Sequence, residues 1–191
     1  MKNFILLLAF FSFSLSTFGQ EGVPEHLKGK ISYPALDFST WVGVIKTDAE
    51  VLTYDPTLEY KVAVDVYGNQ KDSTKIHGSL DEVARTFNLH LANGVPKEKL
   101  KMAVVIHGMA VYAILNEESY QERFKISNPN LVALEALSKA GIELIVCGQN
   151  LGFFNLPKEK ISPLVKVAYS AKTALVTLDQ KGYSFLDVGL K

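Results

Sequence analysis

Apolar and polar residues alternate in blocks from about residue 60 onward, and these blocks predict a series of strands. Lys61–Tyr67 alternates in part, as expected for a half-covered strand. Met102–Ile106 and Ile142–Val146 are continuous apolar runs, which are typical of strands covered on both faces. Shorter segments at Val165–Ala168 and Tyr183–Val188 bring the expected number to about five strands.

Helical patterns separate these strands. Ser79, with Glu82 three residues later, forms a capping-box pattern and predicts the start of a helix. Asn128 and Pro129 predict a second helix, with asparagine as its cap and proline as its first residue. Ser170 is the expected cap of a third helix. Strands and helices in this order predict a three-layer α/β/α fold with a mostly parallel sheet of about five strands.

The chain before residue 60 divides into two segments that lie outside this pattern. A lysine followed by the apolar run Phe4–Phe11 predicts a cleaved signal peptide over residues 1–19. The run is shorter than the roughly 20 residues needed to span a bilayer, so no membrane anchor is expected after cleavage. Residues 20–58 are irregular and are predicted to form an N-terminal extension of the α/β domain at 59–191. The mature protein is therefore expected to be periplasmic or secreted.

Charge and motifs narrow the range of partners. The chain carries 20 basic and 20 acidic residues, and its formal net charge is zero, so neither nucleic acid nor an anionic membrane is expected as a partner. No two histidines have the spacing of zinc ligands, so no metal site is predicted. No Walker loop, dinucleotide fingerprint or serine-hydrolase elbow is present, and no cofactor is expected.

The single cysteine, Cys147, is the leading candidate for chemistry. It directly follows the buried strand Ile142–Val146 and precedes Gly148. In open parallel sheets, ligands and reactive groups gather beyond the carboxyl ends of the strands. One cysteine cannot form an internal disulfide, so the thiol is either a small buried residue or a reactive one. The residue types alone leave both interpretations open.

His107 occupies the equivalent place after the strand Met102–Ile106. If the two strands are neighbours, His107 and Cys147 emerge close together, and both are candidate catalytic residues. His107 is also interpreted as a polar residue that orients its own loop, and this alternative stays open. The residues in the two turns that are expected to bind a ligand are Gly108, Gly148, Gln149 and Asn150.

Several segments between about residues 60 and 188, taken together, resemble the DsrE/DsrF-like (YchN-like) family. They are Ala103–Gly108, Asn128–Asn130, Gly141–Gln149, Val165–Ala168 and Gly182–Tyr183. The sequence Val-Cys-Gly-Gln around Cys147 is the most specific of them. The resemblance implies a small α/β/α domain that commonly assembles as trimers or hexamers. It also implies a sulfur-related role, in which the cysteine matching Cys147 accepts sulfur as a persulfide and passes it to a partner.

Two functions follow as hypotheses. The first is an exported thiol protein that accepts or carries sulfur on Cys147, with a thiol protein, a sulfur-donor protein or a small ligand as its partner. The alternative is a non-enzymatic module that binds a small ligand, or an oligomeric scaffold or redox sensor, in which the cysteine is structural. The familiar sulfur relays of the family work in the cytoplasm, whereas this chain carries an export pattern, so the donor and the acceptor stay open.

Overall fold

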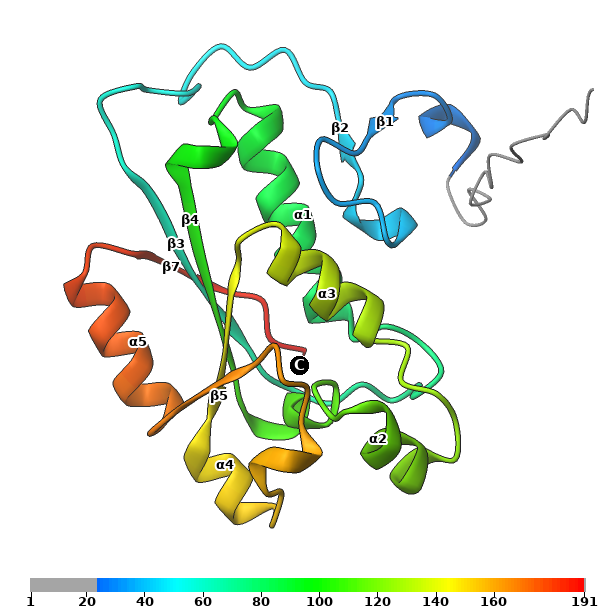
Figure 1. Ribbon diagram of the computed structural model, residues 1–191. Coiled ribbons are helices and arrows are strands. Elements are labelled where there is room, and N and C mark those ends of the chain that lie inside the picture. The colour runs from blue at the N-terminus through cyan, green and yellow to red at the C-terminus, as the bar shows by residue number, and fades with distance from the viewer. Residues whose placement is uncertain (1–23, 191) are drawn as a thin grey trace, which may run out of the picture.

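The computed structural model describes residues 24–190, in which five parallel strands form one sheet (Figure 1). The strands are β3 (Tyr60–Val66), β4 (Leu100–Ile106), β5 (Glu143–Cys147), β6 (Lys166–Ala168) and β7 (Ser184–Asp187). Their order across the sheet is β6-β5-β4-β3-β7, and every neighbouring pair is parallel. The predicted α/β fold with a five-stranded parallel sheet is confirmed. The predicted signal peptide at residues 1–19 lies outside the described residues.

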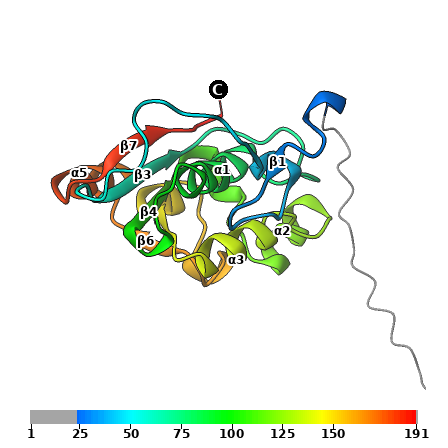
Figure 2. The same ribbon diagram turned by 90° about the horizontal axis from the view of Figure 1, so that it is seen from above.

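Helices cover both faces of the sheet. Helices α1 (Gly78–Ala92) and α3 (Leu131–Lys139) pack on one face, and α5 (Ala171–Gln180) packs on the other, as Figure 2 shows. Because successive side chains of a strand point to opposite faces, each central strand contributes to two apolar clusters, a large one under α1 and α3 and a small one under α5. None of the helices in the described part of the chain is long and apolar enough to cross a membrane.

Two short helices at the carboxyl ends of the strands were not predicted. Helix α2 (Glu117–Phe124) follows β4, and α4 (Gly148–Phe153) follows β5 directly (Figure 1). Helix α2 has a cap that the sequence shows, because the side chain of Asn116 accepts a hydrogen bond from the Ser119 amide at 2.8 Å. Helix α4 has no such cap and two glycines, so its sequence is typical of a turn.

The predicted cap of the first helix, Ser79, is wrong by two residues. Helix α1 begins at Gly78, and its cap is His77, whose Nδ1 accepts a hydrogen bond from the Ser79 amide at 3.3 Å. Burial lowers the pKa of His77, which keeps the imidazole neutral and able to accept. The Ser79 hydroxyl instead donates to the Val188 carbonyl at 2.7 Å. The capping-box pattern predicted that the Ser79 hydroxyl would cap the helix. In the structure this hydroxyl bonds to Val188, a residue distant in sequence.

The predicted start of the second helix is also displaced. Helix α3 begins at Leu131, two residues after Pro129, and Asn130 rather than Asn128 is its cap residue. The Oδ1 atom of Asn128 accepts a hydrogen bond from the Asn130 amide at 2.9 Å, and its Nδ2 donates to the Leu115 carbonyl at 2.6 Å. Asn128 therefore joins the turn before α3 to the segment after β4.

An N-terminal arm, defined as residues 24–58, lies against α1. It contains a two-stranded antiparallel hairpin of β1 (Ile31–Ser32) and β2 (Val44–Ile45). The fully buried side chain of Asn88 on α1 holds the arm. Its Oδ1 accepts from the amides of Ala35 and Leu36 at 3.2 and 3.1 Å. Its Nδ2 donates to the carbonyls of Leu36 and Val42 at 2.7 and 2.8 Å. One side chain thus satisfies four backbone groups of the arm.

Replacing Asn88 by alanine is expected to release the arm. Asn88→Ala leaves buried amides and carbonyls without partners, so we expect a loss of about 3 kcal/mol in the free energy of unfolding. Urea unfolding measures the loss, and limited proteolysis detects cleavage within the arm. Asn93→Ala is the matched control, because Asn93, directly after α1, makes one exposed hydrogen bond to the arm, to the Leu52 carbonyl at 3.2 Å. Equal effects of both substitutions would contradict this role.

Asp81, also on α1, is expected to make stability depend on pH. Burial raises the pKa of Asp81 to about 6 from the ordinary 3.8, while the Ser39 side chain partly opposes the shift. Because the native state holds the proton more tightly, stability is lost as the pH rises through about 6. Asp81→Asn should remove this loss. The free-energy difference between variant and wild type should then grow by about 2 kcal/mol from pH 4 to pH 7 in urea unfolding. A free-energy difference between the two proteins that does not change with pH would contradict this role of Asp81.

Candidate functional site

The structure places His107 and Cys147 side by side at the carboxyl edge, defined as the ends of β3, β4 and β5. Ile106 pairs with Val146, and His107 and Cys147 are the residues that directly follow this last pair of the register. The backbone of His107 is extended, and its amide donates to the Val66 carbonyl at 2.9 Å, which continues the ladder with β3. Both side chains therefore point to the face that α5 covers.

Cys147 is nearly buried, with an exposed fraction of 5%. It packs with small apolar side chains in the cluster under α5, including Ala63, Ala103 and Ala171. Ala171 is the first residue of α5, so the start of this helix covers the thiol. Ala168, the last residue of β6, pairs with Cys147 of β5. The thiol is therefore buried at the carboxyl edge of the sheet, under the start of α5.

The four predicted ligand-binding residues form the two turns beside the cysteine. Gly108 has a positive φ of 59°, and its amide donates to Oδ1 of Asn150 at 3.0 Å. Asn150 thus ties the turn after β4 to α4. The side chain of Gln149 donates to the Tyr169 carbonyl at 3.3 Å, and Gly148 lies close to the Ala168 carbonyl. These contacts hold the turns together, and a ligand-binding role for the four residues remains a prediction.

The sequence reasoning missed an acidic residue in this site, Asp65 on β3. Its Oδ1 lies 2.9 Å from Nε2 of His107, at the distance of an ion pair. The contact lacks the alignment of a hydrogen bond, and this buried oxygen has no other hydrogen-bond partner among the described residues. The signal was a charged residue within the otherwise apolar run Val62–Val66. A carboxylate in a buried strand needs a partner, and a histidine at the end of the next strand can supply it.

An aromatic residue and a second carboxylate extend the site toward β7. The ring of Tyr67 lies over that of His107, with 5.3 Å between centroids and 33° between the ring planes. The Tyr67 hydroxyl donates to Oδ2 of Asp187 at 3.0 Å, and this hydrogen bond raises the pKa of Tyr67. In the described residues, no group of three or more histidine, cysteine or acidic side chains could hold a metal ion. The site therefore presents a thiol, an imidazole and carboxylates on one sheet face.

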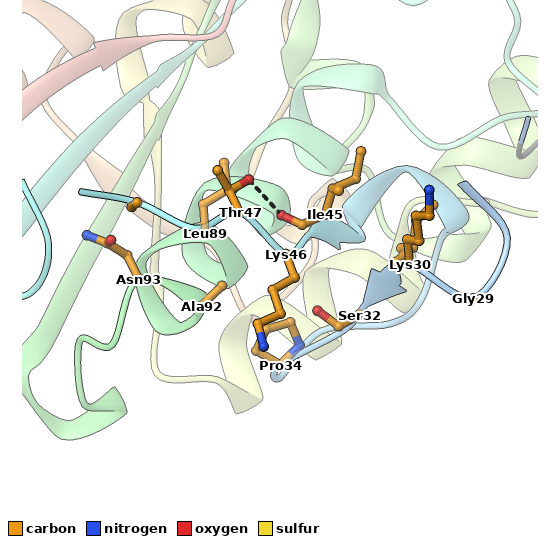
Figure 3. A pocket seen from close by; sticks show the side chains of 12 residues that line it. Gly29, Lys30, Ser32, Pro34, Ile45, Lys46, Thr47, Leu89, Ala92 and Asn93 are labelled. Atoms are coloured by element: carbon orange, nitrogen blue, oxygen red, sulfur yellow. Dashed lines mark hydrogen bonds between the residues drawn. The ribbon is translucent and has the colours of Figure 1, made fainter. Parts of the chain in front are cut away.

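A groove of about 750 Å³ lies elsewhere, between the hairpin of the arm and the end of α1 (Figure 3). Lys46, Leu89 and Asn93 are among the residues that line it, and none of its lining residues belongs to the carboxyl edge. The hydrogen bond in this region joins the Thr47 hydroxyl to the Ile45 carbonyl of the same hairpin at 3.4 Å. The groove therefore has no part in the chemistry of Cys147.

Comparison with known proteins places this site in a family. The model of the DsrE/DsrF-like family matches residues 62–188, a span that includes Asp65, His107 and Cys147. A solved structure of a protein of unknown function from Methanobacterium thermoautotrophicum is similar to this chain, with 16% identity and a TM-score of 0.49. The similarity covers 67% of this chain and 98% of that chain. No curated protein matches the chain closely enough to count as a relative.

Gly148 is expected to be irreplaceable beside the thiol. A Cβ atom on Gly148 would lie 2.8 Å from the Ala168 carbonyl oxygen, so Gly148→Ala must push β5 and β6 apart. We expect a loss of about 2 kcal/mol in urea unfolding, together with faster alkylation of the exposed thiol. Gly152→Ala is the control in the same helix, because a Cβ there meets no atom within 4 Å. It should be neutral or stabilising by up to about 1 kcal/mol, and a similar loss in both variants would contradict the steric argument.

Proposed function

This chain belongs to the DsrE/DsrF-like family, and we propose on that basis that it is a thiol protein that accepts sulfur as a persulfide on Cys147. Membership in the family indicates a role related to sulfur relay. The observation that carries the proposal is the position of Cys147 at the end of β5, beside His107 in the parallel register. Reactive groups in open parallel sheets gather at this edge.

The proposed transfer needs no oxidant or reductant besides the sulfur donor. The Cys147 thiolate attacks the outer sulfur of a small persulfide or polysulfide, R–S–SH. A sulfur–sulfur bond forms at Cys147, the sulfur–sulfur bond of the donor breaks, and its electron pair leaves on RS⁻. The proton lost by the Cys147 thiol ends on this leaving group. A second thiol later attacks the outer sulfur of the Cys147 persulfide, takes it away and returns the cysteine to its thiol form.

The setting of this chemistry is also part of the proposal. The pattern of residues 1–19 supports an exported protein, periplasmic or secreted. Exposed apolar side chains in the segments after β5 and β6 support a homo-oligomer, a trimer or hexamer, with this surface between the copies. They are Phe153 on α4 and Tyr169 before α5, with exposed fractions of 81% and 79%. Sedimentation of the mature protein measures the oligomer size.

The burial of Cys147 favours a second candidate function. With 5% of its surface exposed, the cysteine has the environment of a structural residue. The protein would then be a binding or scaffold module whose thiol takes no part in its function. The two candidates differ in one property, the reactivity of the native thiol.

Exposure of the purified mature protein to polysulfide tests the first candidate. Intact mass spectrometry should show a gain of one sulfur atom per chain, which a reducing thiol then removes. Cys147→Ala should gain none, because the thiol that forms the new bond is absent. A native thiol that stays unmodified, but reacts once the protein is unfolded in urea, would make Cys147 structural and leave the binding module as the function. Retention of the mass gain in Cys147→Ala would also overturn the proposal.

A further inference from the structure

We propose that Asp65 is a positioning residue for this reaction, which holds His107 as the group that takes the proton of the Cys147 thiol. The inference rests on the proposed function, because it concerns the same cysteine. The inference goes beyond the proposed function because it assigns the proton transfer to Asp65 and His107, on the neighbouring strands β3 and β4. Asp65 itself acts through His107 and makes no bond with sulfur.

The contact between Asp65 and His107 is the first support. Oδ1 of Asp65 is buried and lies 2.9 Å from Nε2 of His107, without a hydrogen bond to any donor in the described residues. A buried carboxylate oxygen without a hydrogen bond is costly, and a charged donor offsets much of that cost. A small turn of the His107 ring gives Asp65 an Nε2–H donor, and the contact fixes which ring nitrogen is turned away from Asp65.

The register supplies the second support. Asp65 pairs with Val105 of β4, and His107 lies two residues further along the same face. Cys147 of β5 directly follows Val146, the partner of Ile106, which His107 follows on β4. Neighbouring parallel strands are about 4.8 Å apart, and β4, whose end carries His107, lies between β3 with the carboxylate and β5 with the thiol. Nε2 faces Asp65, which leaves Nδ1 as the nitrogen that takes the thiol proton, directly or through one water molecule.

Other polar groups near His107 do not replace this role. Those that face the same region are Asp65 and Tyr67 from β3, Cys147 from β5 and Asp187 from β7 through its hydrogen bond with Tyr67. Tyr67 contacts the imidazole with its ring, while its hydroxyl is directed to Asp187. Asp65 is therefore the group whose side-chain oxygen lies within contact distance of the imidazole nitrogen.

The proposed proton path balances with the sulfur transfer. The Cys147 thiol gives its proton to Nδ1 of His107, which forms a thiolate and an imidazolium. The Asp65 carboxylate stabilises this imidazolium and stays ionised. After attack on the donor, the imidazolium returns the proton to the leaving RS⁻. An ion pair of thiolate and imidazolium raises the share of the reactive thiolate near neutral pH.

The pH profile of Cys147 alkylation by iodoacetamide in the folded mature protein tests this role. Asp65→Asn keeps the shape of the side chain and removes its charge. We expect alkylation at pH 6.5 to slow by about tenfold, with the rate at high pH unchanged because the thiolate then forms without help. His107→Gln should give the same profile. In the His107→Gln background, Asp65→Asn should have no further effect, because Asp65 acts through the imidazole.

Asp81→Asn is the matched control, since Asp81 and Asp65 are both 9% exposed and Asp81 lies on α1, on the other side of the sheet. It should leave the alkylation profile unchanged. Asp65→Ser, which also removes the charge, serves in place of Asp65→Asn if urea unfolding shows that the asparagine variant does not fold. An unchanged profile in the folded Asp65 variant, or an equal additional effect without His107, would overturn the role of Asp65.

The outcomes for the two proposals are separable. Persulfide formation with an Asp65-independent profile would overturn the role of Asp65 and leave the sulfur-carrier function standing. An Asp65-dependent profile without any persulfide on the wild-type protein would overturn the sulfur-carrier function, and the pair would then activate the thiol for another reaction. A native thiol that does not react with iodoacetamide at any pH would overturn both.

Discussion

The parallel register of β3, β4 and β5 is the constraint on which the rest of the site depends. Pairing of Val66 with Ile106, and of Ile106 with Val146, aligns the ends of three strands at one edge. Side-chain alternation then sends His107 and Cys147 to the same face. A shift of one residue in either pair would turn one of them toward the α1 face, into the large apolar core.

Small side chains are what allow polar chemistry at this edge. Ala63 and Ala103 lie below the thiol in the sheet, and Ala171 brings α5 over it. Gly148 lets the chain leave β5 against the Ala168 carbonyl without a steric clash. The cysteine is consequently held in a tight apolar setting, while Asp65 and the more exposed His107 lie on the same face.

A buried asparagine side chain that bonds to the backbone of a distant segment holds the arm on α1, and another joins turns near the sheet. Asn88 satisfies backbone groups of the arm, and Asn128 joins two turns near the carboxyl edge. In each case one amide side chain supplies both a donor and an acceptor. It can therefore satisfy the backbone groups of segments that have no neighbouring strand to bond to. The arm thereby packs on α1 with little regular structure of its own.

The sequence by itself determined the parallel α/β architecture, because apolar runs, helical stripes and caps are local properties of the chain. It also placed Cys147 and His107 at strand ends, since both follow apolar runs directly. Only the tertiary structure decided which strands are neighbours, and with that the contact of Asp65 with His107. The cap of α1 was decided in the same way, because Ser79 finds a partner 109 residues away in Val188. Such contacts depend on packing between distant segments, and no local pattern records them.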